Sequence, residues 1–575
     1  MPIHNADIAA IFEEIADLLE IQDANPFRVR AYRNAARTIG EYGREVAEIL
    51  AGGGKLPKLP GIGADLAAKI EEIATTGRSR FLEELRAQLP PTITQLLSIP
   101  GLGPKRVKML YDSLQVETLD QLAKAAEAGR IRELPGFGEK TERAILEAIR
   151  AHASQSRRYS IAVATQYAQS LVAHLRKGPG VRQAVVAGSF RRAKETVGDL
   201  DILVTAASGP PVMSHLLAYD EIADVLSHGE TRSSVVLKSG IQVDVRVVPE
   251  ESFGAALHYF TGSKPHNIAI RKLGQERGLK INEYGVFRGE RRIAGETEES
   301  VFAAVGLPWI PPELREDRGE IEAARAGRLP QLVELKALRG DLHVHSKASD
   351  GRHTLRELAE EAHRRGWQYL AITDHSPRLA VTHGLDAKRL MQQIEEIDRL
   401  NETLKGIRLL KGIEVDILED GSLDLADSLL KELDLVVAAV HSHFNLPREQ
   451  QTRRILRAMD HPHFTLLAHP SGREIGGRPP MDVDMERIIR HARERGCYLE
   501  LNAQPERLDL TDIHCQLAKA EGVLVSINSD AHTLLDFDHL RFGVGQARRG
   551  WLEAKDVLNT RSLKELLPIL KKTMG

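Results

Sequence analysis

The segment GDLDILV, residues 198–204, is a short apolar run that carries two aspartates, Asp199 and Asp201. Side chains alternate across a β-strand, so these two carboxylates point to the same face. Two like charges so close repel each other and are costly to bury unless a cation lies between them. One interpretation is an edge strand with a solvated acidic face, and the other is a divalent metal site. The choice between them depends on the rest of the chain.

The whole chain has the length and composition of a multidomain globular protein. Its 575 residues exceed what one core accommodates, and 42% of them are hydrophobic and 28% charged. The formal net charge is −3, so any nucleic-acid surface must be local. Two cysteines, Cys497 and Cys515, exclude a disulfide framework and a cysteine-rich zinc site. The chain has neither the pattern of a signal peptide nor an apolar run of about 18 residues, so we expect a cytoplasmic protein without membrane contact.

The pattern of the chain changes twice along its length. Residues 1–150 have the pattern of helices separated by glycine-containing turns, and short β-branched runs follow between residues 181 and 250. A charged, proline-bounded stretch at 311–340 has the composition of an interdomain connector. Apolar runs alternate with helical patterns from Asp341 onward, which predicts an α/β domain with mainly parallel strands.

Three segments in the first third share the form apolar-Pro-Gly-apolar-Gly. They begin LPGIG at residue 59, IPGLG at 99 and LPGFG at 134, and each precedes a helical pattern. A single copy serves as an ordinary turn between helices, but three copies resemble the helix-hairpin-helix motif, which binds DNA phosphates through backbone N–H groups. Lys105 and Arg106 beside the second turn fit this interpretation. The glycines assigned to DNA binding are Gly61, Gly63, Gly101, Gly103, Gly136 and Gly138.

A third carboxylate, Asp244 in VDVRVV (243–248), lies in another predicted strand. Three carboxylates from adjacent strands can hold two Mg²⁺ or Mn²⁺ ions, which are hard cations that also bind phosphate oxygens. Two such ions about 3.5–4 Å apart stabilise the attacking and leaving oxygens of a phosphoryl displacement. Under this hypothesis, metal ions between the two aspartates of GDLDILV offset the repulsion between their carboxylates.

The motifs GSFRR, GDLDILV, VDVRVV and YFTGSKPHNIAIR (259–271) together resemble a family X DNA polymerase, the group that contains DNA polymerase beta. The resemblance extends over about residues 1–315. It implies that Asp199 and Asp201 bind both metals, and that Asp244 binds the catalytic metal and is oriented by Arg246. It further implies contacts with the incoming nucleotide or the template by Ser189, Arg192, Gly198, Tyr259, Phe260, Gly262, Asn267 and Arg271.

Three positions depart from the polymerase beta pattern. Lys264 replaces an acidic residue, and a cation there would strengthen triphosphate binding. Lys69 matches the Schiff-base lysine of a deoxyribose-phosphate lyase, but Asp65 and Phe81 replace lysines that bind the 5′-phosphate in that enzyme. Lys69 is therefore either a lyase nucleophile or a surface lysine. Tyr32, beside a row of arginines, is a candidate for stacking on a base or sugar.

Seven segments after residue 340 consist of an apolar run followed by polar residues. Functional residues gather at the carboxyl ends of parallel strands in α/β barrels. Imidazoles and carboxylates converging there without cysteine indicate more than one metal, for which Zn²⁺ or Mn²⁺ is suited. The residues at these ends are His343, His345, Asp350, His375, Glu414, His441, His469, Asp530 and His532.

The nine residues resemble the ligand pattern of the PHP (polymerase and histidinol phosphatase) domain over about residues 336–570, with Asp350 where some members have histidine. The resemblance implies a distorted seven-stranded barrel with three Zn²⁺ or Mn²⁺ ions that act on phosphate esters. Further candidates for supporting the ligands or binding substrate are Asp374, His383, His443 and Asn502.

The two resemblances together imply a bacterial family X polymerase that fills short gaps during base excision repair. Its expected partners are gapped or primed DNA and dNTPs, and we expect a monomer. The PHP domain would act as a 3′–5′ exonuclease and possible abasic-site endonuclease. A small-molecule phosphatase in that domain and a noncatalytic DNA-end scaffold are the alternatives.

The fold class predicted from these motifs is multidomain. Helical DNA-binding regions at 1–88 and 89–157 precede an α+β nucleotidyltransferase palm at 158–250 and a nucleotide- and template-contacting subdomain at 251–315. A linker at 316–338 then leads to the PHP phosphoesterase domain at 339–575, a distorted (β/α)7 barrel.

Overall fold

The computed structural model describes the chain apart from residues 1–4, 23, 41–45, 52, 57–61, 87, 89–92, 94–95, 97–98, 100–101, 156–157, 379–381 and 476–477. The chain forms two compact units, residues 1–157 and 158–575, and each is described by itself. A helix with the length and apolarity to span a membrane does not occur among the described residues.

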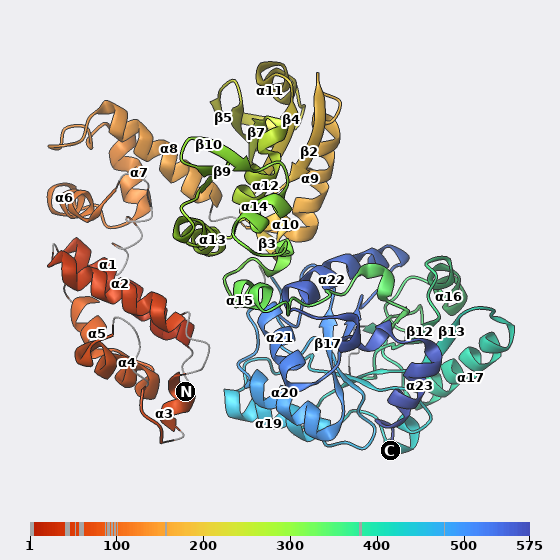
Figure 1. Ribbon diagram of the computed structural model, residues 1–575. Helices are drawn as coiled ribbons and strands as arrows, with labels where there is room; N and C mark the ends of the chain where they lie inside the picture. Colours follow the sequence, from red (N-terminus) through yellow and green to blue (C-terminus); the bar gives the residue numbers. More distant parts are fainter. Residues whose placement is uncertain are drawn as a thin grey trace. The chain divides into compact units, whose positions relative to one another are not determined.

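The first unit is helical, as the sequence predicts (Figure 1). Glycines open two of its helices, because α4 begins after Gly63 and α6 after Gly103, both in extended conformation. Thr118 accepts a hydrogen bond from the Gln121 N–H in a capping box that begins α7. One apolar core joins these helices. The helices are α1 Asn5–Ile21, α2 Pro26–Gly40, α3 Val46–Ala51, α4 Ala64–Thr76, α5 Arg80–Arg86, α6 Pro104–Leu114, α7 Leu119–Glu127 and α8 Glu139–Gln155.

The second unit begins with a five-stranded sheet of order β2-β4-β7-β6-β5. β4 and β7 run parallel, and the other neighbouring strands are antiparallel. The apolar residues of β4 and β7 alternate with the predicted metal ligands and pack against α9 (Ile161–Leu175) and α11 (Gly209–Leu217) in one core. The strands are β2 Val181–Val186, β4 Asp199–Ala206, β5 Ile222–His228, β6 Arg232–Leu237 and β7 Gln242–Val248, and a small pair is formed by β1 Tyr159–Ser160 and β3 Thr196–Val197.

A second subdomain surrounds a buried ion-pair network. The Glu298 carboxylate accepts two hydrogen bonds from Arg191 at 2.7 Å and one from Arg315 at 2.6 Å. Arg191 belongs to the short helix α10 (Gly188–Arg191), so this network fixes α10 against the second subdomain. The elements of this subdomain are α12 Phe253–Thr261, α13 Lys264–Glu276, β8 Lys280–Asn282, β9 Gly285–Arg288, β10 Arg291–Ala294 and α14 Glu298–Ala304.

The connector predicted at 316–338 is folded rather than extended. Its helix α15 (Glu320–Arg325) buries Glu320, whose carboxylate lies 2.7 Å from Nδ1 of the buried His266. Glu316 and Arg318, which precede this helix, make ion pairs with Arg192 and Asp512 respectively. The charges that give this stretch the composition of a linker are therefore counterions in an interface.

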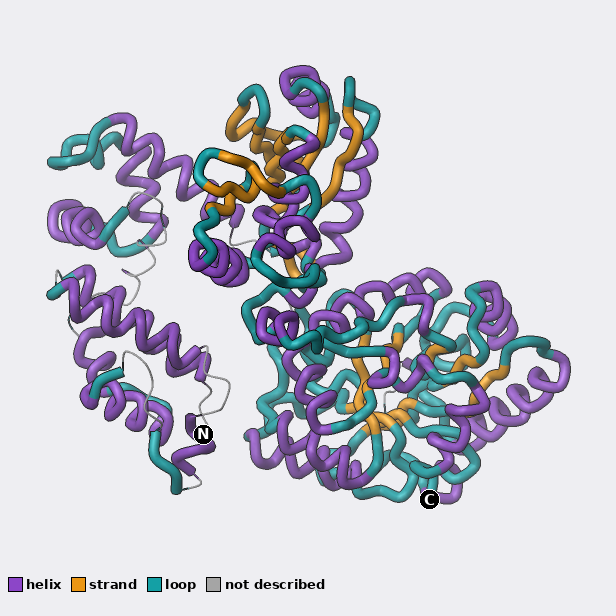
Figure 2. Tube along the Cα trace, viewed as in Figure 1, coloured by secondary structure: helices purple, strands orange, loops and turns teal. Residues whose placement is uncertain are grey.

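The C-terminal domain consists of parallel strands enclosed by helices (Figure 2). Its strands form two sheets, β11-β12-β13 and β14-β15-β16-β17-β18, and parallel bridges from Val344 to Ala531 and from His375 to Glu414 continue the pairing between them. This arrangement agrees with the expected barrel. The strands are β11 Gly340–Asp341, β12 Tyr369–Ile372, β13 Arg408–Lys411, β14 Glu414–Asp416, β15 Val437–Ala439, β16 Leu466–Leu467, β17 Tyr498–Asn502 and β18 Val525–Asn528.

Helices connect and cover these strands. They are α16 Leu355–Arg364, α17 Ala387–Thr403, α18 Asp427–Leu430, α19 Arg448–Met459, α20 Met485–Arg495, α21 Asp512–Glu521, α22 Leu540–Arg549 and α23 Leu563–Lys571. Apolar side chains from both faces of the strands are buried, as expected for a parallel sheet covered on both sides.

Candidate active sites

The three predicted carboxylates of the palm sheet lie on two adjacent parallel strands. Asp201 on β4 is the register partner of Asp244 on β7, and Asp199 lies two residues before Asp201. Hydrogen bonds from Ser234, from Gln242 at 3.1 Å and from Arg232 at 3.4 Å orient the Asp244 carboxylate. The sequence assigned this orienting role to Arg246, whose guanidinium lies 4.4 Å from the centre of the Phe260 ring.

Burial, followed by mutual repulsion, sets the electrostatics of these carboxylates. Burial together with the charges of Asp199 and Asp244 raises the pKa of Asp201 to about 7. Burial and Asp244 also raise the pKa of Asp199. The triad is not among the described clusters whose ligand atoms all lie within 4.8 Å of one another. A divalent cation would relieve this repulsion, so the donor set fits hard metals.

The short helix α10 approaches the triad closely. A Cβ added to Gly188, which has φ +62°, would lie 2.4 Å from an Asp201 oxygen, so only glycine fits there. The guanidinium of Arg192, at the end of α10, donates to the Thr261 carbonyl at 2.6 Å and to Glu316 at 3.0 Å. Ser189 lies half-buried within α10, and Gly198 immediately precedes β4.

The predicted nucleotide contacts cluster around the end of α12. The rings of Tyr259 and Phe260 meet edge to face with 5.0 Å between their centroids. Asn267 donates to the Tyr259 carbonyl at 2.7 Å, and Arg271 donates to the Asn267 carbonyl at 3.3 Å. Gly262 follows α12 with φ +68°, and a Cβ there would lie 3.2 Å from Nη1 of Arg192. The structure thus connects these residues to one another, and Lys264 is exposed at the start of α13.

Two of the predicted DNA-binding glycines, Gly61 and Gly101, lie outside the described residues. The other four are Gly63, Gly103, Gly136 and Gly138, and a Cβ added to any of them would meet no described atom within 4 Å. Arg106 bridges two of the turns, because its Nη2 donates to the Gly136 carbonyl at 3.1 Å. The side chain of Lys105 is outside the described part of the structure.

The prediction that Tyr32 stacks on a base or sugar is wrong. Its side chain is buried in the helical core, where its ring stacks on Phe81 and contacts Phe12. The ammonium of Lys69 lies 2.5 Å from the Asp65 carboxylate and 5.6 Å from the centre of the Phe81 ring. Asp65 and Phe81, which replace the polymerase beta lysines, are thus direct neighbours of the candidate nucleophile Lys69.

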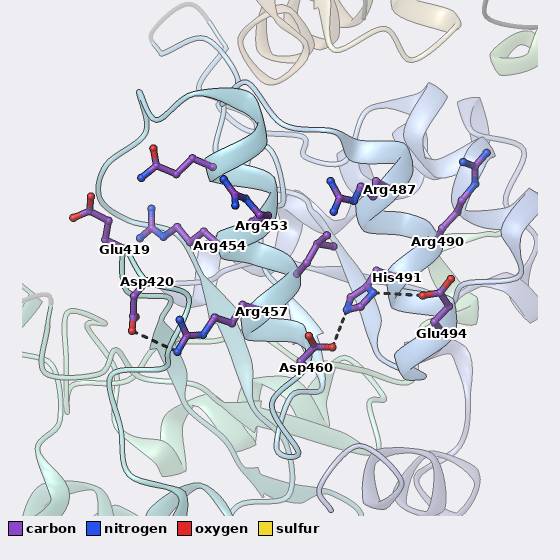
Figure 3. A pocket seen from close by; sticks show the side chains of 12 residues that line it. Glu419, Asp420, Arg453, Arg454, Arg457, Asp460, Arg487, Arg490, His491 and Glu494 are labelled. Atoms are coloured by element: carbon purple, nitrogen blue, oxygen red, sulfur yellow. Dashed lines mark hydrogen bonds and ion pairs between the residues drawn. The ribbon is translucent and has the colours of Figure 1, made fainter. Parts of the chain in front are cut away.

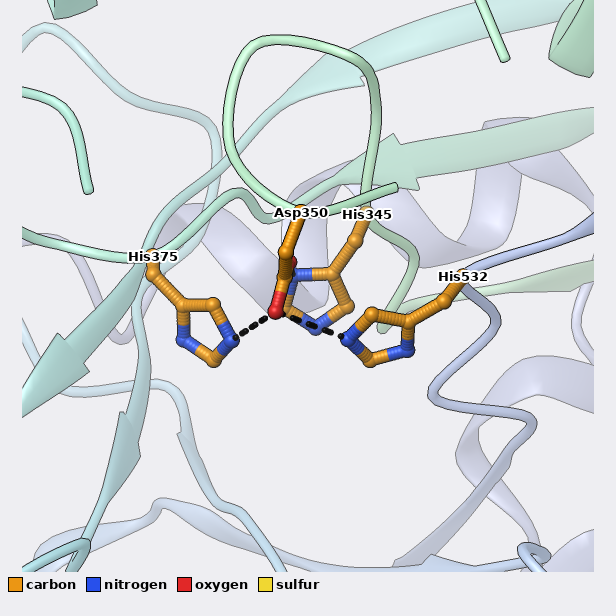
Figure 4. A group of neighbouring side chains, drawn as sticks. All are labelled: His345, Asp350, His375 and His532. Atoms are coloured by element: carbon orange, nitrogen blue, oxygen red, sulfur yellow. Dashed lines mark ion pairs between the residues drawn. The ribbon is translucent and has the colours of Figure 1, made fainter. Parts of the chain in front are cut away.

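The structure brings together all nine predicted ligands of the C-terminal domain. Asp350 lies 3.4 Å from His375 and 3.3 Å from His532, with His345 beside them (Figure 4). His343, His345 and Asp530 form a second cluster, and His375, Glu414 and His441 form a third. His469 joins them through a 3.0 Å contact with Glu414. Three overlapping clusters of nitrogen and oxygen ligands are the expected arrangement for several divalent metals.

Buried polar atoms without hydrogen-bond partners support metal binding. Nε2 of His343, Nδ1 of His345 and Oε2 of Glu414 are buried and accept or donate no hydrogen bond in the described part of the chain. Burial and the neighbouring His375 and His532 lower the pKa of His345 to about 4, so its ring is a neutral ligand at pH 7. Burial opposes protonation of His375, yet Glu414 and Asp350 raise its pKa to about 10.

Two supporting carboxylates were not predicted from the sequence. Glu500 lies 2.7 Å from Nδ1 of His343, and Asp416 lies 2.6 Å from Nδ1 of His441. Each fixes the ring so that Nε2 faces the cluster, which is the usual role of carboxylates behind metal-binding histidines. Each lies two residues from a predicted candidate on the same strand, Asp416 from Glu414 and Glu500 from Asn502, and this i, i+2 spacing is the signal in the sequence that could have identified them.

The four further candidates differ in position. Asn502 donates to Glu500 at 3.2 Å and to Asp530 at 3.0 Å, so it supports the ligands. Asp374 accepts hydrogen bonds from the 346–349 loop. His383 and His443 have positive φ angles of 56° and 55°. These hydrogen bonds show that Asp374 organises the loop at residues 346–349, which follows β11.

A cavity of about 580 Å³ opens onto two of the nine ligands, Asp530 and His532. Its wall includes Arg507, whose Nε lies 3.9 Å from Asp530, and the carboxylates of Glu474 and Glu506. A cation at this position suits an anionic substrate that approaches the clusters.

The larger cavity of about 740 Å³ lies between α19 and α20 and shares no residue with the clusters (Figure 3). Carboxylates engage most of its arginines, and Arg454 donates to backbone carbonyls. Arg487 pairs with Glu449 at 3.1 Å, and Arg457 lies 3.8 Å from Asp420. The metal-ligand chemistry therefore lies at the strand ends and not in this cavity.

Comparisons with known proteins agree with the division of the chain into helical, polymerase and PHP parts. Family models match residues 3–79 (helix-hairpin-helix domain), 93–151 (SAM-like helix-hairpin-helix tandem), 256–316 (DNA polymerase beta thumb) and 341–504 (PHP domain). The chain is 41% identical over 577 residues to the DNA polymerase/3′-5′ exonuclease PolX of Bacillus subtilis (strain 168), which covers 99% of this chain and 100% of the relative.

Shorter relatives match the C-terminal part alone. A probable phosphatase of Thermoanaerobacter sp. (strain X514) is 30% identical over 249 residues, 41% of this chain and 96% of the relative. A probable phosphatase of Syntrophotalea carbinolica is 36% identical over 203 residues, 33% of this chain and 79% of the relative.

Proposed function

Because the chain belongs to the family of the Bacillus DNA polymerase/3′-5′ exonuclease PolX, we propose that it fills short gaps in DNA by template-directed synthesis and degrades DNA 3′ ends in its PHP domain. The observation that carries this proposal is the presence of two separate ligand sets, the palm carboxylates and the nine PHP residues. They share no residue, so each set supports its own reaction.

Asp199, Asp201 and Asp244 hold two Mg²⁺ or Mn²⁺ ions in the proposed polymerase site. Such cations, when bound, stabilise charge on the attacking and leaving oxygens of nucleotidyl transfer. Ser234 and Gln242 keep the Asp244 carboxylate in place by hydrogen bonding.

The chain's own cations and rings hold the incoming dNTP. Arg192 binds the triphosphate together with Ser189 and the backbone at Gly198, and exposed Lys264 adds positive charge. Tyr259 and Phe260 line the sugar pocket, Asn267 contacts the base, and Arg271 contacts the template. The contacts of Asn267 with Tyr259 and of Arg271 with Asn267 support this placement, since they connect the base and sugar sides.

The open turns of the first unit bind the phosphates of gapped or primed DNA. A Cβ added at any of the four described glycines would meet no described atom within 4 Å, and this open surface supports the proposal. Because such contacts position DNA without selecting bases, affinity is independent of sequence. The protein acts as a monomer. Its domains have the boundaries predicted from the sequence, from the helical domain at 1–88 to the PHP domain at 339–575.

The PHP clusters hold three Zn²⁺ or Mn²⁺ ions, which when bound supply Lewis acidity and activate water for phosphodiester hydrolysis. Glu500 and Asp416 orient His343 and His441 toward these ions. Arg507 in the adjoining cavity binds a non-bridging oxygen of the scissile phosphate. Cleavage at abasic sites would use the same groups. Lyase activity at Lys69 is less well supported, because Asp65 binds its ammonium.

A small-molecule phosphatase in the PHP domain is the second candidate, because probable phosphatases match this part of the chain. Comparing hydrolysis of p-nitrophenyl phosphate with degradation of a 3′-recessed primer separates the two functions. Faster turnover of the small ester, with no loss of primer nucleotides, would support the phosphatase.

The proposed division is tested with a labelled primer on gapped duplex in Mn²⁺. The Asp199→Ala variant should still shorten the primer but should not extend it with dNTPs. The double variant His343→Ala, His345→Ala should extend it without degradation, because two imidazoles are lost from the PHP clusters. Primer shortening at the wild-type rate by the histidine variant would place the nuclease outside the PHP domain.

A further inference from the structure

Among the contacts between the PHP domain and the polymerase part of the second unit is a buried arginine, Arg549 at the end of α22. Its Nη1 donates to the Glu316 carboxylate at 2.8 Å and to the backbone carbonyl of Arg192 at 2.9 Å. Its Nη2 donates to Asp512 at 2.7 Å, and the Arg549 side chain is 5% exposed. Arg549 therefore contacts both the backbone of Arg192 and the carboxylate that binds the Arg192 side chain.

Glu316 is shared between two arginines from the two domains. The same oxygen, Oε1, accepts from Arg549 at 2.8 Å and from Nε of Arg192 at 3.0 Å. Glu316 is 11% exposed and Arg192 12% exposed, so water screens these charges weakly. Burial favours protonation, but Arg192 and Arg549 together lower the pKa of Glu316, which stays charged.

The Arg192 guanidinium is held on a second side by the Thr261 carbonyl, which accepts from Nη1 at 2.6 Å. Gly262 follows this carbonyl and lies against the same nitrogen. The orientation of Arg192 thus depends on two acceptors, Thr261 and Glu316. Only Glu316 carries a charge that competes with a triphosphate for the guanidinium.

We infer that Arg549 of the PHP domain is a positioning residue of the polymerase: it neutralises Glu316 so that Arg192 is oriented but remains free to bind the triphosphate of the incoming dNTP. Without Arg549, Glu316 is left with Arg192 and the nearby Lys194, so more of its charge acts on Arg192 and on the approaching triphosphate, which it repels. This inference rests on the role proposed above for Arg192 in nucleotide binding.

The test measures KM and kcat for single-nucleotide insertion into gapped DNA by the full-length chain. Arg549→Gln should raise KM for dNTP about tenfold, or about 1.4 kcal/mol of binding, with little change in kcat. Glu316→Gln in the same chain removes the competing charge, so the double variant should return KM to within about twofold of wild type. A role in folding alone would not be rescued in this way.

Arg548→Gln is the matched control. Arg548 precedes Arg549 on α22 and also crosses to the polymerase part, where it donates to Glu313 at 2.7 Å and to the Val333 carbonyl at 3.1 Å. It contacts neither Glu316 nor Arg192 in the described structure, so its loss should leave KM for dNTP unchanged. An equal rise in KM in this variant would overturn the inference and indicate general loosening of the interface.

Arg192→Gln separates this inference from the proposed function. If Arg192→Gln leaves KM unchanged, Arg192 does not bind the nucleotide and the proposed role fails. If Arg192→Gln raises KM but Arg549→Gln does not, the polymerase assignment stands and the inference about Arg549 is refuted. A KM that stays high in the Arg549→Gln, Glu316→Gln double variant would also refute it.

Discussion

Replacing Glu500 by glutamine tests whether the buried carboxylate behind the PHP clusters sets their metal affinity. One oxygen of Glu500 faces Nδ1 of His343 at 2.7 Å and the Asn528 amide at 2.9 Å. The other accepts from the backbone N–H of His469 at 2.8 Å and from the Asn502 amide at 3.2 Å. All four partners are hydrogen-bond donors when the His343 ring presents Nε2 to a metal. Only a carboxylate, with two acceptor oxygens, can accept from all four.

The size of the effect follows from these contacts. Glutamine has one acceptor oxygen, so its NH₂ group must face two of the four donors. The bond to His343 also loses its charge, which weakens the bond and reduces the basicity of the ring. Losing such a partner costs about 10–100-fold in metal affinity or activity, which corresponds to roughly 1.4–2.7 kcal/mol. We expect 3′ degradation to fall by this factor, while primer extension stays within about twofold of wild type.

The assay combines metal content by elemental analysis with degradation of a labelled 3′ end at increasing Mn²⁺. Added metal should partly restore the Glu500→Gln rate, because affinity and not chemistry is impaired. Glu494→Gln is the control, since Glu494 is 62% exposed and contacts His491 rather than a ligand. Unchanged metal content and nuclease rate in a folded Glu500→Gln variant would refute the supporting role.

Three further predictions concern other parts of the chain. Lys105→Glu with Arg106→Glu should weaken binding to all duplexes alike and flatten its salt dependence, as measured by fluorescence anisotropy, because phosphate contacts are lost. Metal uptake by the PHP clusters should release protons, and metal affinity should increase as pH rises from 7 toward 9. The reason is that Glu414 and Asp350 raise the pKa of His375 to about 10 against the effect of burial, so a metal must displace the proton of His375. Calorimetry in buffers of different ionisation enthalpy measures this proton release. Glu298→Gln should lower the free energy of unfolding by about 3–5 kcal/mol in denaturant titrations, since the buried Arg315 and the half-buried Arg191 lose their counterion.

The Glu298 network also predicts a pH dependence with a definite sign. Burial favours the neutral acid, but Arg191 and Arg315 hold the pKa of Glu298 far below its usual range. A depressed pKa in the folded state stabilises the protein above the unfolded value of about 4.5, and this contribution is lost as pH falls toward the folded value. Wild type should therefore lose stability below pH 4.5 more steeply than Glu298→Gln, and equal slopes would contradict the role of this carboxylate.

The palm carboxylates could be predicted because strand alternation and motif order are local properties. Asp199 and Asp201 share a strand face at i and i+2, and the apolar run around Asp244 indicates a second strand. The register that makes Asp201 and Asp244 direct neighbours depends on parallel pairing across 42 residues of intervening chain. The residues that orient Asp244 follow from this register, so Ser234 on the adjacent β6 had no signal of its own.

The incorrect prediction for Tyr32 has a similar origin. Helical spacing places Arg30 and Arg33 on one side of α2, and Tyr32 was assigned to that side because it is adjacent in sequence. The helix turns by about 100° per residue, and in the structure the Tyr32 ring faces α1 and α5 and packs on Phe12 and Phe81. Adjacency in sequence does not place two side chains on one helix face.

The interface between the polymerase and PHP parts shows why charge composition alone misidentifies a connector. Glu316, Arg318 and Glu320 give the stretch after residue 315 a high charge density, which is typical of a solvated linker. Each has a buried or half-buried partner, and the partner of Glu316 on α22 lies 233 residues further along the chain. A buried charge is stable only where its counterion is fixed, so the pairs of Glu316 with Arg549 and of Arg318 with Asp512 hold the two domains together. Under the inference above, the polymerase site then depends on a side chain of the other domain, because Arg549 neutralises the carboxylate that orients Arg192.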